Sequence, residues 1–243
     1  MPESRLSGEG KRIGLIGGLA FRAGVFYYER IVQILNAAGV TPKILVNHAD
    51  VTTALAFLVA GDKAGLGAYV GALANELFAG GAEIVAVTAV APHFAIDVIR
   101  DVARGPVIDV LSLVPAAIQA SGSDRVAIFG NRAAIETDIF GAVPPTAVVR
   151  LSPTEVDRVH ATYSEIALRG KRGTQPETDL LSSLARELIH GRAARTIVLA
   201  GTDLSSFYAD SAPDYPHLDL AQLHIDEIVR QVIPSIASRP APR

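Results

Sequence analysis

Short β-branched hydrophobic runs alternate along the chain with longer segments rich in alanine and leucine. This alternation is typical of strands that feed crossover helices, so it predicts an α/β protein with parallel sheets. The expected strands are Arg12–Ile16, Ile44–Asn47, Ile84–Val87, Val107–Val110, Arg125–Phe129, Ala147–Leu151 and Thr196–Leu199. The expected helices are Ala23–Ala38, Gly67–Ala79, Ala95–Arg104, Leu111–Ala120, Ala133–Phe140, Pro153–Leu168, Glu177–Gly191 and Leu220–Ser235.

The two halves of the chain are weakly similar to each other. The matching segments are Ile13–Gly18 followed by Arg22, with Val126–Asn131 followed by Arg132, and Val87–His93 with Leu199–Leu204. Open parallel sheets bind ligands at the carboxyl ends of their strands. The duplication therefore predicts two similar lobes with a ligand cleft between them.

Composition narrows the class of protein. With 49% hydrophobic and 19% charged residues, the chain can bury a substantial core. The net charge of −3, with no basic cluster beyond residues 169–172, indicates neither a nucleic-acid partner nor a membrane surface. The first ten residues lack an apolar signal core, and no run reaches the roughly 18 apolar residues of a membrane span. The expected location is cytoplasmic.

Neither a metal nor a nucleotide cofactor is expected. The chain has no cysteine, which excludes thiolate metal sites and disulfides. His217 and Asp219 have a two-residue metal spacing, but no third ligand has matching spacing. Gly14, Gly17 and Gly18 lack the dinucleotide-binding spacing, and they favour a tight turn that a ligand carboxylate can approach closely.

Several segments spread over nearly the whole chain resemble the aspartate/glutamate racemase superfamily. They are Gly17-Gly18-Leu19, Tyr27–Ile31, Val46–Asp50, Gly61-Asp62, Gly80–Glu83 and the late His224. The resemblance implies two pseudo-symmetric parallel-sheet α/β lobes with the site in the interlobe cleft. One lobe would hold residues 1–115 and 217–243, and the other residues 116–216. It also implies a homodimer and a small carboxylate or amino-acid substrate, with no cofactor or metal.

The departures from the superfamily pattern concentrate in the two turns that carry its catalytic cysteines. Aligned on His93, the first turn places Ala89 at the cysteine position, followed by Val90 and Ala91. The second turn is Gly201-Thr202-Asp203, with glycine at the other cysteine position. A thiol with a pKa of about 8.5 can take a proton from a substrate carbon or return one to it, whereas alanine and glycine transfer no protons. Two-thiol racemisation is therefore excluded.

Other polar side chains near the expected strand ends can supply chemistry. His93 and Asp203, with Thr202 beside it, are the candidate proton-transfer residues on opposite sides of the cleft. Alternatively, His93 stabilises its turn and Asp203 caps a helix. Arg22 and Arg132 are candidate carboxylate anchors, unless they are plain surface arginines. The remaining candidate substrate-binding residues are Asn131, Asn47, Thr88, Tyr27 and His224.

Two classes of function remain open. The first is a cofactor-independent enzyme that acts at the carbon next to a carboxylate, as an isomerase, a lyase or a decarboxylase. The second is a catalytically inactive homologue that binds a small carboxylate or a protein partner. The first turn is apolar and the second keeps Thr202 and Asp203, which favours one-sided chemistry or binding over symmetric two-base racemisation.

Overall fold

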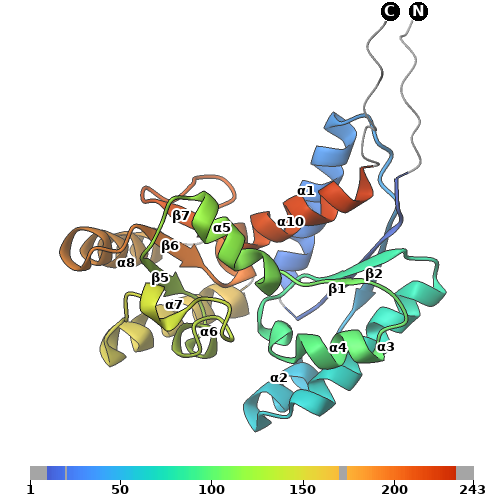
Figure 1. Cartoon of the computed structure of the whole chain (residues 1–243), viewed down its shortest axis with the longest axis horizontal. Coiled ribbons are helices and arrows are strands. Elements are labelled where there is room, and N and C mark those ends of the chain that lie inside the picture. The colour runs from blue at the N-terminus through green and yellow to red at the C-terminus, as the bar shows by residue number, and fades with distance from the viewer. Residues whose placement is uncertain (1–9, 20, 170–173, 234–243) are drawn as a thin grey trace, which may run out of the picture.

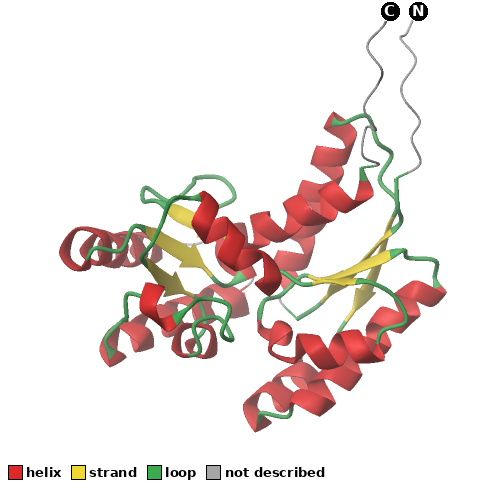
Figure 2. Cartoon of the chain, in the orientation of Figure 1, coloured by secondary structure: helices red, strands yellow, loops and turns green. Residues whose placement is uncertain are grey.

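The fold consists of two parallel sheets (Figures 1 and 2). The strand orders are β2-β1-β3-β4 and β5-β6-β7. A computed structural model describes residues 10–19, 21–169 and 174–233. The sequence also predicts frayed tails at Met1–Gly10 and Ser238–Arg243. These tails except Gly10, most of the basic cluster at 169–172, and the end of the last expected helix lie outside the described residues. The strands are β1 (Ile13–Gly17), β2 (Ile44–His48), β3 (Ile84–Val87), β4 (Val107–Ile108), β5 (Val126–Phe129), β6 (Thr196–Leu199) and β7 (His217–Asp219).

The helices connect successive parallel strands as crossovers, which confirms the α/β prediction. They are α1 (Phe21–Ala37), α2 (Val51–Ala60), α3 (Lys63–Ala79), α4 (Ile96–Val102), α5 (Val114–Ala120), α6 (Arg132–Glu136), α7 (Pro153–Arg169), α8 (Gln175–Arg186), α9 (Thr202–Phe207) and α10 (Leu220–Val232). None of the described helices has the length and apolar character needed to span a membrane.

Strands β1 and β3 of the first sheet are buried on both faces because their successive residues point into two different cores. Ile13 and Leu15 of β1 pack in one hydrophobic cluster with α1 and α10. Ile16 packs in another cluster with α2, α3 and α4. Successive strand residues point to opposite faces, so a continuous apolar strand such as Ile13–Gly17 needs helices on both sides.

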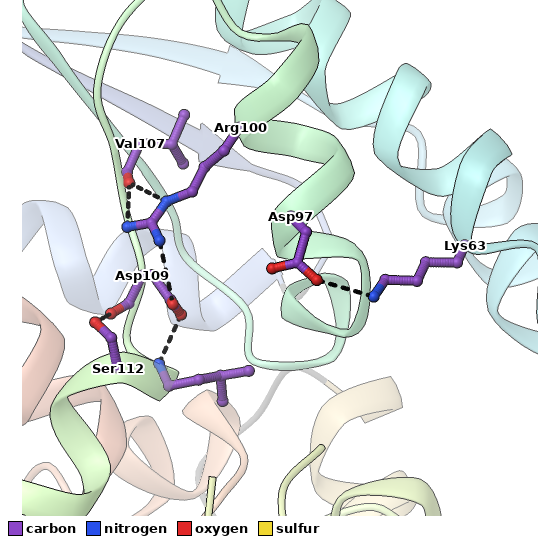
Figure 3. Close-up of polar contacts among 7 residues, drawn as sticks. Lys63, Asp97, Arg100, Val107, Asp109 and Ser112 are labelled. Carbon is purple, nitrogen blue, oxygen red and sulfur yellow. Dashed lines mark hydrogen bonds and ion pairs between the residues drawn. The ribbon is translucent and has the colours of Figure 1, made fainter. Parts of the chain in front are cut away.

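Helices α3 and α4 lie against each other at glycines. A Cβ atom on Gly67 would lie 2.4 Å from Val98, and one on Gly71 would lie 2.6 Å from Val102, so only glycine permits this approach. At the edge of the same interface, Lys63 Nζ and Asp97 Oδ2 form an ion pair at 3.1 Å (Figure 3). The close packing holds the layer beneath the first sheet together.

The crossing from the first lobe to the second is fixed at the end of β4. The Arg100 guanidinium donates to the carbonyl oxygen of Val107 at 3.2 and 3.1 Å and lies 3.5 Å from Asp109 Oδ2 (Figure 3). The Asp109 side chain accepts from the Leu111 amide at 2.8 Å, and its carbonyl accepts from the Ser112 hydroxyl at 2.8 Å. These bonds satisfy backbone groups that a two-residue strand leaves open.

The expected strand Ala147–Leu151 is wrong. The structure has a 3₁₀ turn at Pro145–Ala147, followed by a single parallel bridge between Val148 and Val126. Proline lacks the N–H that a sheet ladder needs, so the segment pairs with β5 only beyond the prolines. The structure also adds α2, α9 and β7, which were not expected.

Helix α6 ends at Glu136 instead of Phe140. Asp138, Ile139, Phe140 and Gly141 all have positive φ, between 50° and 83°, which a right-handed helix cannot accommodate. The Asp138 carboxylate accepts two hydrogen bonds from the Arg150 guanidinium, which holds this left-handed turn in place.

The two lobes contact each other at several places. Val90 of the first lobe is buried within the hydrophobic core of the second. Phe94 lies with its ring centroid 5.9 Å from that of Phe140, and α1 packs on α9. Strand β7 pairs with β6 in the second sheet, while α10 returns to the first-lobe core. The expected lobe boundaries remain a prediction.

Candidate active site

Both turns identified from the sequence follow the carboxyl ends of strands. The first, from Thr88 to His93, follows β3, and the second, Gly201–Asp203, follows β6 and begins α9. Parallel sheets place these ends at one edge, where crossover helices begin and ligands bind. Within this region the structure forms two separate polar clusters.

The first cluster centres on Asp203, whose side chain is only 3% exposed. Its Oδ2 accepts a hydrogen bond from the Tyr163 hydroxyl at 3.2 Å. Burial raises the pKa of Asp203 to about 6, although the Tyr163 hydrogen bond and the positive charge of Arg22 act in the opposite direction. A carboxyl group that titrates near neutrality can both take and give a proton at physiological pH.

Thr202 and Arg22 lie beside Asp203. The Thr202 hydroxyl is buried and has no hydrogen-bond partner among the described residues. Arg22 reaches from α1 across to α9, where its Nε donates to Ser206 Oγ at 3.5 Å. A cavity of about 220 Å³ lies between these two helices. It is lined by Phe21, Arg22, Val25, Phe26, Glu29, Ser206, Ala209 and Asp210.

The second cluster is a chain of three buried rings. The Tyr27 hydroxyl lies 3.1 Å from His224 Nδ1, and the ring centroids of His224 and His93 are 5.7 Å apart. His93 Nδ1 bonds to the carbonyl oxygen of Ala89 at 2.9 Å, so it donates its proton there. Burial lowers the pKa of both histidines, that of His224 to about 3. Both rings are therefore neutral at pH 7.

Four other predicted site residues are engaged in contacts with the protein's own backbone or side chains. Thr88 is fully buried and donates its hydroxyl to the carbonyl of Ile16 at 3.1 Å. Asn47 donates its amide to Leu73 and Glu76 on α3. Asn131 caps α6 through a hydrogen bond from the Ala134 amide at 2.8 Å. Arg132 pairs with two carboxylates, those of Glu136 and Asp157.

Sequence reasoning missed Tyr163, which lies on α7, far along the chain from either turn. Its ring occupies the space in front of Gly201, where a Cβ atom would lie 2.2 Å from Cε2 of the tyrosine. A polar aromatic residue on the inward face of α7, in register with Val156, Val159 and Ile166, was the available signal. Nothing in the sequence connected that face with position 201.

Metal ligands do not gather at this site. Across the part of the chain that the structure describes, no group of three or more His, Cys, Asp or Glu side chains converges in a way that could hold a metal ion. The donors available near Asp203 are a phenol, a hydroxyl and a guanidinium, which suit an anionic organic ligand.

Two facing parallel-sheet α/β lobes, with the candidate site where their strands end, define the class of two-lobed racemase-like proteins. Residues 16–228 match the family model described as Asp/Glu/Hydantoin racemase, and the chain belongs to this family. The chain departs from the superfamily pattern, which has a catalytic cysteine in each of the two turns, because it has no cysteine. No curated protein matches the chain.

Solved structures share this fold at low sequence identity. A putative Asp/Glu racemase from Yersinia pestis is 19% identical with a TM-score of 0.73, over 90% of this chain and 98% of that one. An aspartate racemase homologue from Pyrococcus horikoshii OT3 is 18% identical with a TM-score of 0.74, over the same shares. The aspartate racemase of Picrophilus torridus is 13% identical with a TM-score of 0.70, over 91% and 94%. These similarities confirm the predicted two-lobed fold.

Proposed function

We propose that this chain is a cofactor-independent enzyme that acts at the carbon next to a carboxylate in a small amino acid or dicarboxylate. The observation that carries the proposal is the buried Asp203 carboxyl, whose pKa of about 6 suits proton transfer near neutral pH. In this assignment Asp203 moves the proton. Arg22 binds the substrate carboxylate, and the Thr202 hydroxyl donates to a substrate oxygen.

His93 has a different role in this proposal from the one that its sequence position suggests. Its Nδ1 is engaged by the Ala89 carbonyl, and its ring packs against His224 inside the core. We therefore assign it to supporting the first turn. Arg22 is the better carboxylate anchor, because it lines the cavity between α1 and α9 and its charge acts on Asp203, whereas Arg132 contacts Glu136 and Asp157.

The proposal is tested by α-proton exchange in D₂O, followed by NMR across a panel of amino acids and dicarboxylates. Asp203→Asn is expected to slow exchange by about 100-fold or more, because it removes the group that takes the proton. Asp226→Asn, on the exposed face of α10, is the matched control and is expected to exchange at the parent rate. Exchange that survives Asp203→Asn would remove Asp203 from the reaction.

A catalytically inactive carboxylate-binding protein is the second candidate. The buried Val90, which packs into the second-lobe core where relatives are expected to present polar groups, favours it. The same panel separates the two candidates. Saturable binding with neither α-proton exchange nor turnover of any panel member supports the binding protein and contradicts the enzyme.

We also infer that the chain forms a homodimer through exposed apolar residues on α2. Val51, Leu55 and Val59, spaced four residues apart along one side of this helix, are 40%, 50% and 88% exposed. Such stripes on a folded surface favour self-association. Sedimentation velocity is expected to show a dimer, and combining Leu55→Glu with Val59→Glu is expected to produce monomers.

The control for the dimer is Leu168→Glu, since Leu168 is 83% exposed on α7 of the other lobe. This variant is expected to remain dimeric. A monomeric parent protein would contradict the dimer. A dimer that persists in the Leu55→Glu/Val59→Glu variant would place its interface elsewhere. The cytoplasmic location expected from the sequence remains a prediction.

A further inference from the structure

Position 201 has no room for a side chain. A Cβ atom built on Gly201 would lie 2.2 Å from Cε2 of Tyr163 and 2.9 Å from both Cδ2 and Cζ. These distances are far below van der Waals contact, so the tyrosine ring occupies the space that a side chain at 201 would use. The substitution of cysteine by glycine at this position is thus matched by an aromatic residue from another element.

The same tyrosine binds Asp203. Its hydroxyl donates to Asp203 Oδ2 at 3.2 Å, and burial raises its own pKa well above the usual value, so it keeps its proton. Helix α7 holds the ring in place through Val156, Val159 and Ile166, which are buried in the second-lobe core. Tyr163 therefore acts on Asp203 as a fixed hydrogen-bond donor.

The titratable groups around Asp203 come from three neighbouring helices. Arg22 on α1 lowers its pKa, as does Tyr163 on α7. Asp219, at the start of α10, accepts a hydrogen bond from Ser205 of α9 at 2.6 Å, so it is tied to the helix that carries Asp203. Burial raises the pKa of Asp203 and the Tyr163 hydrogen bond lowers it, so removing the Tyr163 hydroxyl should raise this pKa further.

The first turn carries no group comparable with Asp203. The first-turn residues Ala89 and Val90 are 6% and 3% exposed, and neither side chain can transfer a proton. His93, the nearest titratable residue in that turn, bonds back to the Ala89 carbonyl. The first lobe contributes Arg22 and the exposed Glu29 to the neighbouring cavity, so Asp203 is the buried carboxyl group that a substrate held beside it meets.

We propose that Tyr163 is a positioning residue that fills the space at position 201 and directs Asp203 to exchange protons with one face of the substrate only. This inference rests on the proposed function. In the exchange step, the Asp203 carboxylate takes the proton from the α-carbon, and the bonding electrons move into the adjacent carboxylate. The neutral Asp203 carboxyl, after exchanging its proton with solvent, returns a proton to the same face.

One-face chemistry predicts exchange without racemisation. An enantiomerically pure substrate that exchanges in D₂O is expected to take up deuterium at the α-carbon while its enantiomeric excess stays unchanged, as followed by NMR and chiral chromatography. Racemisation at a rate comparable with exchange would overturn the inference, because it requires proton transfer on both faces.

Tyr163→Phe tests the positioning role, because it keeps the ring at position 201 and removes only the hydroxyl. The pKa of Asp203, followed by ¹³C NMR titration and assigned with Asp203→Asn, is expected to rise by about one unit from about 6. The acidic limb of the exchange-rate profile, where Asp203 is protonated and cannot take the substrate proton, is expected to shift upward equally, with a larger change in kcat than in KM.

Tyr208→Phe is the matched control, since the Tyr208 hydroxyl pairs with Tyr215 at 3.0 Å and not with Asp203. It should leave the Asp203 titration unchanged. An unchanged Asp203 pKa in Tyr163→Phe would overturn the positioning role. If the parent protein exchanges no α-proton, the proposed function and the one-face inference are both contradicted. The NMR titration of Asp203 in Tyr163→Phe still decides, independently of activity, whether Tyr163 controls the pKa of Asp203.

Discussion

Gly201→Ala is expected to lower the free energy of unfolding by about 2 kcal/mol, the cost of overpacking a filled site. The new methyl group would lie 2.2 Å from the Tyr163 ring, which cannot turn aside without losing its hydrogen bond to Asp203. Gly201→Cys meets the same obstacle. Restoring cysteine at this position is therefore expected to destabilise the chain, and chemical denaturation measures the change.

A double-mutant cycle identifies the cause of that loss. Tyr163→Ala removes the ring, so Gly201→Ala should cost at least about 1 kcal/mol less in the Tyr163→Ala background. Gly191→Ala is the control, because a Cβ atom there meets nothing within 4 Å. Equal costs of Gly201→Ala in the two backgrounds would show that Tyr163 does not occupy the space at position 201.

Acidification is expected to destabilise the protein through the buried ring chain. The pKa of His224 is lowered to about 3 by burial and by its neighbour His93, whereas in the unfolded chain it lies near ~6.5. Between these values the unfolded state binds the extra proton. The stabilising contribution is therefore complete above pH ~6.5 and falls as the pH drops, reaching a loss of about 3 kcal/mol near pH ~4.

His224→Gln isolates this effect, since an amide oxygen can still accept from the Tyr27 hydroxyl but does not titrate in this range. The free energy of unfolding, measured with denaturant from pH 7 to pH 4, is expected to fall less steeply than in the parent. The difference in slope should correspond to the uptake of about one proton fewer on unfolding. Asp203 acts with the opposite sign, because its raised pKa makes the folded state bind more protons between pH ~4 and about 6. Comparison of the two proteins cancels that contribution.

His48→Gln is the control for the acid experiment, because His48 is exposed on β2. It should keep the parent pH dependence. If His224→Gln showed the same slope as the parent, the proton would not be taken up at His224 on unfolding. His93 would then be the next residue to replace, because burial lowers its pKa as well.

Much of the fold was predictable because buried parallel strands leave a local signature. Six of the expected strands correspond to β1 through β6, because each contains a short apolar run in the sequence. The seventh, Ala147–Leu151, was wrong because its apolar pattern did not reveal the cost of Pro144 and Pro145. Strand β7 was missed because His217–Asp219 is too short and too polar to show a pattern.

The candidate site was only partly predictable. The sequence located Thr202 and Asp203 after a strand, and Arg22 at the start of a helix, since these positions follow from local structure. It did not separate Asp203 from His93, although the structure places one beside Arg22 and the other against His224. That distinction depends on which buried neighbours each side chain meets.

The sequence by itself determined that this chain has parallel α/β lobes and that no thiol can carry its chemistry, because hydrophobic periodicity and composition are local properties. Only the tertiary structure decided what replaces the thiol at position 201. Tyr163 lies 38 residues from Gly201 along the chain, and the packing of α7 on α9 brings its ring into that space. Contacts between distant elements depend on the whole core, so no local pattern encodes them.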